Sequence, residues 1–384
     1  MFERIKDVGH PDEQMLSVFR DYGVVAKDSR DNINKTAENR NIYQLVHPGW
    51  LVTNRMKAWQ GSVGISELRG IVSGHYICFA PRHDEDSRFL NWLFRSPVYA
   101  AGYALQSRGV RIGQAEIDND LYRVMPVLLP PLDEQRAIAE FLDRETARID
   151  TLIAEQQRLI ELLQERRDAQ IESSVAPLEW NVPLRALTEL VQTGPFGSQL
   201  KSEEYEVGGV PVVNPSHLQG GAIVPDRSVA VGEGKAAELS RHALEMGDVV
   251  VARRGELGRC AAVEAESVGF LCGTGSALIR SLSAHLLPDF LALVFGSRRN
   301  RDALSLSSVG STMDNINADI ISALRVPAPP LDEQRRIVVY LDEQTAKIDI
   351  LIAETEKFIE LARERRSAVI TAAVTGQIDV RGAA

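Results

Sequence analysis

Residues 130–171 read PPLDEQRAIAEFLDRETARIDTLIAEQQRLIELLQERRDAQI, and residues 329–370 read PPLDEQRRIVVYLDEQTAKIDILIAETEKFIELARERRSAVI. From residue 131 onward, 25 of 41 positions are identical in the two copies without a gap. The repeat distance of 199 residues is far longer than a solenoid unit. The sequence therefore predicts that a module made of a domain and a helical segment occurs twice.

The repeated stretch has the pattern of amphipathic helices. Two prolines favour a helix start, and Asp133 and Asp332 are suitable caps. We expect a first helix that ends near Asp143 and a longer one from about Thr146 to Ile171. The predicted apolar seam comprises Ile149, Leu152, Ile153, Leu159, Ile160 and Leu163, and in the second copy Ile348, Leu351, Ile352, Phe358, Ile359 and Ala362.

One apolar seam per helix is too narrow for burial inside a globule, so each long helix needs a partner. Its own copy is covalently attached and therefore present at high local concentration, which predicts an antiparallel coiled coil within the chain. About 26 residues at 1.5 Å each give a rod of roughly 40 Å. A rod of this length would hold two domains about as far apart as two half-sites one turn apart on B-DNA, which are separated by roughly 34 Å. The alternative is that the helices pair with another chain.

Weaker sequence similarities between the two halves occur outside the helices at nearly the same offset. Residues 48–66 align with 246–264, and FLNWLFRS (89–96) aligns with FLALVFGS (290–297). The predicted fold class is α+β: two mixed α/β domains in a pseudo-twofold arrangement, separated by two long helices. The expected segments are a first domain at 1–130, a helical spacer at 131–172, a second domain at 173–329, a second spacer at 330–371 and a tail at 372–384.

The same alignment leaves the start of the first domain short. Residues 180–200, which open the second domain, have no counterpart before Met1. Either the first domain lacks its opening strand and loop, or the chain start is truncated or misassigned. Residues 371–382 align with 172–183, so on a circular frame the tail would end near the beginning of the first domain.

Composition narrows the functional class. A chain that is 44% hydrophobic and 25% charged is typical of a globular protein. Its three cysteines lack a CxxC pattern, which fits a reducing cytoplasm. No apolar run approaches 18 residues and no signal-peptide core is present, so we expect no membrane partner. The spacing of histidines and acids predicts no metal site.

The net charge of −10 argues at first sight against nucleic acid. Residues 1–131 nevertheless carry a net charge of +1, while the helical blocks 132–171 and 331–370 carry −4 and −2. More than half of the acidity therefore lies in the helices. The charge permits DNA binding where a partner shares the phosphate contacts.

Polar and basic loop residues are the candidate DNA contacts. In the second domain these are Ser198, Gln199 and Lys201 in the loop GPFGSQLK (194–201), Arg253 and Arg254 after an apolar strand, and Thr312, Asn315 and Asn317 in a polar loop. In the first domain they are Arg55, Lys57, Trp59, Gln60, Arg108 and Arg111. The alternatives are an ordinary turn, a solvated strand end, asparagines that suit turns, and a core position for Trp59. The cluster Arg298, Arg299 and Arg301 is either a contact or a solvated helix face.

Enzyme motifs are missing from the sequence. No GxxxxGK[ST] phosphate loop is present. NPSH (214–217) is superficially similar to the NPPY-type motif of adenine methyltransferases, but it lacks the stacking aromatic residue, and no glycine-rich cofactor loop accompanies it. We therefore expect a chain without catalytic residues and without a bound cofactor or metal.

The combination of the PPLDEQ helical block, GPFGSQLKSEEY (194–205), GDVVVARRGELGRC (247–260) and GSTMDNINADIISALRVPAPPLDEQ (310–334) resembles the specificity subunits of type I restriction–modification systems. The resemblance covers nearly the whole chain. It implies two target-recognition domains, each reading one half of a split, asymmetric DNA sequence, separated by an antiparallel coiled coil. The loop at 107–119 departs from the pattern because it lacks GSTMDNIN.

The resemblance also implies partners. These are double-stranded DNA, two methyltransferase subunits and two restriction (motor–nuclease) subunits. S-adenosylmethionine would bind in the methyltransferase, which modifies adenine N6, and ATP and Mg²⁺ would bind in the restriction subunit. The alternative function is a coiled-coil scaffold whose two domains bind proteins and do not read DNA.

Overall fold

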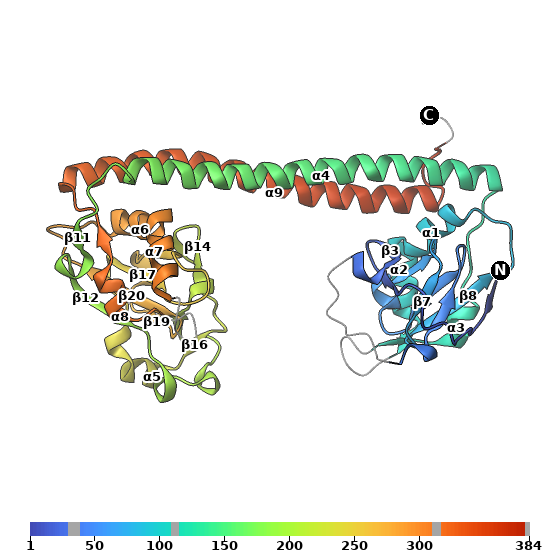
Figure 1. The fold of residues 1–384 in the computed structure, drawn as a ribbon, viewed down its shortest axis with the longest axis horizontal. Helices are drawn as coiled ribbons and strands as arrows, with labels where there is room; N and C mark the ends of the chain where they lie inside the picture. The colour runs from blue at the N-terminus through green and yellow to red at the C-terminus, as the bar shows by residue number, and fades with distance from the viewer. Residues whose placement is uncertain (30–38, 109–114, 309–315, 381–384) are drawn as a thin grey trace. The chain divides into compact units, whose positions relative to one another are not determined.

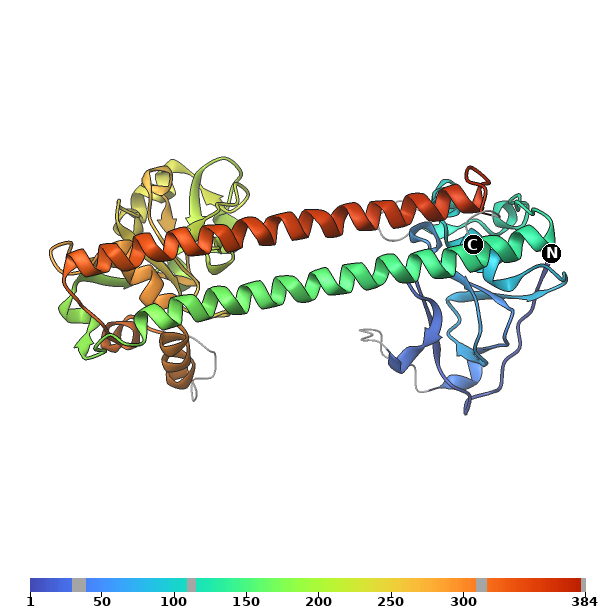
Figure 2. The ribbon, with the colours of Figure 1, turned by 90° about the horizontal axis from the view of Figure 1, so that it is seen from above.

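The computed structural model describes residues 1–29, 39–108, 115–308 and 316–380 (Figure 1). The chain divides into two compact units. Unit 1 comprises Met1–Arg158 and Thr355–Ala384, and unit 2 comprises Leu159–Glu354. Two long helices, α4 (Leu132–Val175) and α9 (Leu331–Val374), each contribute residues to both units. Each has 44 residues and is unbroken, in green and red respectively in Figure 2.

The expected helix break near Asp143 is therefore wrong. Thr146 was expected to help start a new helix, but its hydroxyl donates to the carbonyl of Leu142 at 2.6 Å within α4. Thr345 makes the same bond to Leu341 at 2.8 Å within α9. A hydroxyl that bonds the carbonyl four residues earlier is compatible with a continuous helix.

Unit 1 is built on a four-stranded antiparallel sheet in the order β1-β8-β5-β6. The helices outside α4 and α9 are α1 (Ser87–Arg95), α2 (Pro97–Leu105) and α3 (Asn119–Arg123). The strands are β1 (Phe2–Arg4), β2 (Leu16–Phe19), β3 (Gly23–Ala26), β4 (Gln44–Val46), β5 (Leu51–Asn54), β6 (Val63–Ile65), β7 (Gly70–Val72), β8 (Tyr76–Pro81), β9 (Ser107–Arg108) and β10 (Glu116–Ile117).

Unit 2 repeats this sheet in the order β12-β20-β17-β18. Its strands are β11 (Val182–Pro183), β12 (Thr188–Thr193), β13 (Val210–Val213), β14 (Leu218–Gln219), β15 (Ala222–Ile223), β16 (Ala230–Val231), β17 (Asp248–Ala252), β18 (Cys260–Ala262), β19 (Leu271–Cys272), β20 (Ser276–Ser281) and β21 (Arg325–Val326). The helices are α5 (Glu233–Glu238), α6 (Pro288–Gly296), α7 (Arg298–Ser308) and α8 (Ala318–Ala323).

The opening strand of the first domain is present. β1 pairs with β8 in an antiparallel register that joins Glu3 to Ala80, and β12 pairs with β20 in the same manner. The alternative in which the first domain lacks this strand is therefore wrong. Its sequence at Phe2–Arg4 is too short and too dissimilar to residues 188–193 for the alignment to detect it.

Successive side chains of the central strands face two different hydrophobic cores in each unit. In unit 1, Leu51 faces a core that also contains residues of α1 and α2, while its neighbour Val52 faces a second core with Leu16 and Val46. This is the two-residue period of a strand buried on both faces. The first core also includes Ile138 of α4, Ile370 of α9 and Val380 of the tail. The tail thus packs on unit 1, as the circular alignment predicts.

The seam between the long helices is narrower than the sequence suggested. Ile149, Leu163, Ile348 and Ile359 are buried, and Ile153, Ile160, Ile352 and Ala362 are half-buried. Four predicted seam residues lie on the outer surface, with exposed fractions between 37% and 48%: Leu152, Leu159, Leu351 and Phe358. Each of these precedes a seam residue by one position, which turns it about 100° around the helix.

Candidate nucleic-acid interface

Three loops of unit 2 meet at one end of its central sheet. β12 ends at Thr193, and the next amide, of Gly194, donates to the carbonyl of Ser276 at 2.9 Å. β17 ends at Ala252, and the amide of Arg253 donates to the carbonyl of Gly275 at 3.0 Å. The stretches GPFGSQLK, RR (253–254) and GTG (273–275) therefore lie together.

Glycines allow these loops to pack against one another. A Cβ atom at Gly194 would lie 1.9 Å from the carbonyl oxygen of Gly273. A Cβ atom at Gly275 would lie 2.8 Å from Cδ of Pro215 and 2.9 Å from Nε of Arg254. Both distances are shorter than real Cβ contacts, so any larger residue would displace backbone or a packed ring. The close packing fixes the backbone from which the neighbouring side chains project.

The NPSH stretch (214–217) supports the same loops. The Asn214 side-chain oxygen accepts a hydrogen bond from the Gly275 amide at 3.4 Å. His217 is buried, and its Nδ1 lies 3.0 Å from the carbonyl oxygen of Val212. These contacts give Asn214 and His217 a structural role beside the glycine loop.

The side chain of Arg253 is occupied by main-chain acceptors. Its Nε donates to the carbonyl of Ile316 at 2.8 Å, and its Nη1 donates to that of Thr274 at 3.3 Å. The Ile316 amide donates in return to the Arg253 carbonyl at 2.8 Å. Burial and the nearby charge of Arg254 lower the pKa of Arg253. This geometry favours a structural role for Arg253, which holds the segment leading into α8.

In unit 1 the main chain of an arginine makes the equivalent contacts, while its side chain has a different partner. The Arg55 amide donates to the His75 carbonyl at 3.0 Å, and the Ile117 amide donates to the Arg55 carbonyl at 3.1 Å. The Arg55 guanidinium forms an ion pair with Glu116. Arg55 and Arg253 therefore occupy equivalent positions, each fixing a buried isoleucine that precedes a short helix.

The remaining candidates differ in what their side chains do. Lys57, Gln60 and Arg254 are exposed, and Arg108 is exposed with its Nε 3.4 Å from Asp118. Trp59 is half-buried and donates to the Met56 carbonyl at 3.1 Å, which favours a packing role.

The loop candidates of unit 2 divide in the same manner. Lys201 is exposed, while the Gln199 side-chain oxygen accepts from the Phe196 amide at 3.4 Å. Ser198 lies beside Gln199 in a short 3-10 helix. Asn317 caps α8 by accepting from the Ile320 amide at 2.8 Å, so its amide serves a helix end. Arg111, Thr312 and Asn315 lie outside the described residues.

One exposed residue in the glycine loop was not among the sequence-based candidates. Phe196 is 59% exposed, although it is a large aromatic side chain. Its position before Gly197 in GPFG was the available signal, because glycine has no side chain to cover the ring. An exposed aromatic ring at this end of the sheet is suited to stacking on a base or inserting between base pairs.

The basic cluster of α7 faces α4. Arg301 forms an ion pair with Asp168 at 2.8 Å, and the Arg298 amide donates to the Glu172 carboxylate at 3.1 Å. The guanidinium carbon of Arg299 lies 4.8 Å from the centre of the Trp180 ring. The cluster therefore attaches α7 to the end of α4 within unit 2.

Within the described ranges, 1–29, 39–108, 115–308 and 316–380, no helix is long and apolar enough to cross a membrane. No group of three or more His, Cys, Asp or Glu side chains in that part of the chain could hold a metal ion.

Comparison with known proteins shows which proteins this chain is similar to. Residues 177–360 match the family model described as type I restriction modification DNA specificity domain. The type I restriction enzyme EcoKI specificity subunit of Escherichia coli (strain K12) is 23% identical over 307 residues, 76% of this chain and 66% of that protein. The StySPI specificity subunit of Salmonella potsdam is 24% identical over 209 residues, 53% of this chain and 44% of that protein.

A solved structure, described as the structural basis of complex assembly and conformational transition of the type I R-M system, shares the fold with a TM-score of 0.67. It is 16% identical, and the match covers 97% of both chains. The matched stretches of the two specificity subunits span less than two thirds of their length. Residues 177–360 thus match the type I restriction modification DNA specificity domain, and over 76% of its length the chain is similar to a type I restriction enzyme specificity subunit.

Proposed function

We propose that this chain is the non-catalytic DNA-recognition subunit of a type I restriction–modification enzyme. The observation that carries the proposal is the duplicated sheet with its equivalent anchors, Arg55 with Ile117 and Arg253 with Ile316. Each anchor fixes the backbone at the end of a sheet from which different exposed side chains project. In unit 2 this end belongs to the residues that match the DNA specificity domain, which supports the proposal.

Each unit would read one half of the target. Arg254, Lys201 and Phe196 are the proposed contacts of unit 2, and Lys57, Gln60 and Arg108 are those of unit 1. Two readers with a related frame but different side chains would bind two different half-sites. In a pseudo-twofold arrangement this produces a split, asymmetric target, whereas two identical readers would require a palindrome.

The long helices would separate the two readers and bind partner subunits. Leu152 and Leu159 of α4, and Leu351 and Phe358 of α9, give each helix apolar residues on its outer side. Exposed apolar surface at repeated positions suits two copies of one protein partner. We propose that this partner is the methyltransferase subunit, which would supply S-adenosylmethionine and the catalytic residues for modification of adenine N6, and that restriction subunits complete the enzyme.

Mapping of N6-methyladenine tests the proposal. The chain would be co-expressed with its methyltransferase partner in a host without other adenine methylation, and the modified sequences would be determined genome-wide. A split motif with a fixed gap is the expected result. An unmodified genome from a correctly assembled complex would reject the proposal and would favour a scaffold that binds proteins through both domains.

A further inference from the structure

The glutamine of PPLDEQ makes equivalent contacts in both units. Gln135 and Gln334 are both fully buried. The Gln135 oxygen accepts from the Asp86 amide at 3.0 Å, and its nitrogen donates to the Pro130 carbonyl at 2.8 Å and to the Glu85 carboxylate. The Gln334 oxygen accepts from the Leu287 amide at 2.9 Å, and its nitrogen donates to the carbonyls of Pro329 and His285, both at 2.8 Å.

The bonds of each amide join three parts of its unit. Asp86 and Leu287 are the N-cap residues directly before α1 and α6. Pro130 and Pro329 belong to the connection that leads from the domain into the long helix, and each glutamine lies in the first turns of that helix. One side chain therefore links the domain, the connection and the helix.

The apolar contacts between each domain and its long helix act differently from these hydrogen bonds. Ile138 and Leu142 of α4 pack into the core of unit 1. The hydrophobic effect holds such surfaces together but is non-directional. Hydrogen bonds near 2.9 Å, by contrast, require a defined angle between donor and acceptor. The glutamine amide therefore supplies a directional contact between each domain and its helix.

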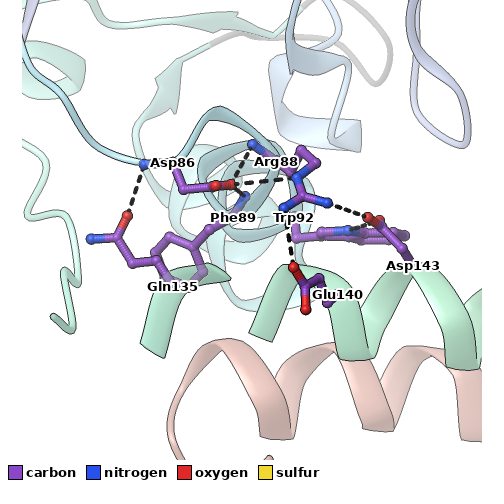
Figure 3. A network of polar contacts seen from close by, with 7 residues as sticks. All are labelled: Asp86, Arg88, Phe89, Trp92, Gln135, Glu140 and Asp143. Carbon is purple, nitrogen blue, oxygen red and sulfur yellow. Dashed lines mark hydrogen bonds and ion pairs between the residues drawn. The ribbon is translucent and has the colours of Figure 1, made fainter. Parts of the chain in front are cut away.

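The polar surroundings of the two glutamines differ. In unit 1 the Trp92 indole donates to the Asp143 carboxylate at 2.8 Å, and Arg88 lies 3.6 Å from Asp143 and 3.9 Å from Glu140 (Figure 3). The aligned positions of unit 2 hold Asp289, Leu293, Val339 and Asp342, and partial loss of solvation and the charge of Asp289 raise the pKa of Asp342. The glutamine contact is thus shared by joints that otherwise differ in charge.

We propose that Gln135 and Gln334 are positioning residues, each of which sets the angle between a recognition domain and its long helix. Through that angle each would fix the register in which its half of the DNA target is presented. The second statement rests on the function proposed above, whereas the first concerns the geometry of the free protein. Two measurements separate them.

The first measurement needs no DNA. Spin labels at Leu105→Cys, on the 88% exposed end of α2, and at Glu155→Cys, on the exposed side of α4, report the distance between the domain and the helix in unit 1. Gln135→Met keeps the length of the side chain but removes its hydrogen bonds. We expect a broader distance distribution in Gln135→Met, and the wild-type distribution in the control Gln157→Met on the exposed surface of α4. An unchanged distribution in Gln135→Met would overturn the proposal.

The second measurement uses the assembled methyltransferase complex. Targets whose gap is one base pair shorter or longer are compared with the native target. We expect Gln135→Met and Gln334→Met to reduce discrimination between these gaps at least tenfold, about 1.4 kcal/mol, while the letters of both half-sites are unchanged. Unaltered discrimination would show that the glutamines are structural only, and altered letters would show a contact role. Either result would overturn the proposal.

A second variant addresses loss of folding. Gln135→Asn keeps both the acceptor and the donor on a side chain that is one methylene shorter, so an effect between wild type and Gln135→Met is expected in both measurements. An effect equal to wild type would contradict the required hydrogen-bond geometry. If the wild-type complex modifies no split motif while the distance distribution still broadens in Gln135→Met, the proposed function fails and the positioning role stands.

Discussion

Arg167 and Asp349 form an ion pair in unit 2, with 3.3 Å between Nε and Oδ1. Their counterparts 199 positions away, Arg366 and Asp150, form the equivalent pair in unit 1 at 2.8 Å between Nε and Oδ1. Each pair lies within one unit and joins α4 to α9. The helices are therefore antiparallel in the same register in both units, which is the structural counterpart of the sequence repeat.

These ion pairs are expected to contribute little to stability individually. In the Arg167–Asp349 pair, the arginine side chain is 28% exposed and the aspartate side chain 51%. Solvent screens such pairs, and measured coupling energies are typically about 0.2–1 kcal/mol. A double-mutant cycle with Arg167→Met and Asp349→Ala, followed by urea unfolding, should give a coupling energy in this range that decreases with salt. A coupling well above 1 kcal/mol would contradict the prediction.

Replacement of Arg253 should destabilise unit 2. Arg253→Met removes the donors to the Ile316 and Thr274 carbonyls. Leaving buried acceptors without partners costs about 1–3 kcal/mol, so the free energy of unfolding should fall by about that amount. Arg254→Ala, at the exposed neighbour, should change stability by less than about 0.5 kcal/mol. Denaturant unfolding of both variants measures the difference.

For DNA affinity we expect the reverse: replacement of Arg254, and not of Arg253, should weaken binding. We expect Arg254→Ala to weaken binding at the half-site of unit 2 and to lower the slope of log affinity against log salt by about 1, as for one lost phosphate contact. Arg55→Met and Lys57→Ala form the matched pair in unit 1. Loss of affinity in Arg253→Met with full stability retained would show that Arg253 also contacts DNA.

Neutralisation of Asp342 should stabilise unit 2. Partial loss of solvation, with a smaller contribution from the charge of Asp289, raises the pKa of the Asp342 carboxyl above its ordinary value, although the residue remains exposed. A raised folded-state pKa contributes stability below the unfolded-state pKa, and that contribution is lost as pH rises through the folded value. The ionised group is therefore unfavourable at neutral pH. Asp342→Asn should raise Tm at pH 7, and the difference from wild type should shrink below about pH 4.

Asp342 and its neighbour Glu343 are both exposed, and Glu343→Gln is the control for Asp342→Asn. A similar gain in Tm from Glu343→Gln would assign the effect to the general acidity of the helix. Asp289→Arg provides an independent check because it introduces the charge found at Arg88 in unit 1. It should raise Tm at neutral pH by replacing repulsion with attraction.

The three cysteines should be unreactive in the folded protein. Burial raises the thiol pKa of Cys78 and of Cys260 to about 12 and raises that of Cys272 well above its usual value. Because the thiolate is the nucleophile, iodoacetamide at pH 8 should label the native chain far more slowly than the urea-unfolded chain. The same shifts predict that stability falls as pH rises from about 8.5 toward 12. Rapid native labelling of any of the three would contradict the prediction.

The sequence predicted the duplicated architecture because the helical blocks repeat almost residue for residue. The sequence overestimated the number of residues in the seam, because apolar residues next to a coiled-coil seam follow nearly the same spacing as the seam residues. The observed seam is also partly polar. Thr146 and Thr355 are buried in it, and Arg167 and Arg366 reach it with their charges paired. Hydrophobic periodicity alone cannot identify such positions.

The candidate site was less predictable than the fold. Arg253 and Arg254 are adjacent in sequence and chemically identical, yet one is bonded to main-chain carbonyls and the other is exposed. The difference arises from Ile316, which lies 63 residues away and meets Arg253 only in the folded chain. Phe196 was missed because its exposure depends on the loops that pack behind it. Neither contact can be recognised from the neighbouring residues in the sequence.

The proposed spacing role of the helices leads to a quantitative prediction. Seven residues inserted after Arg158 in α4, together with seven after Glu354 in α9, preserve the heptad phase of the seam and leave both ion pairs within their units. At 1.5 Å per residue the insertion adds about 10 Å, which corresponds to about three base pairs at 3.4 Å each. Methylation mapping should therefore show a gap about three base pairs longer with both half-sites unchanged. The same insertion in α4 alone would disrupt the register of the seam and should impair assembly. An unchanged gap in the double insertion would show that the helices do not set the distance between the readers.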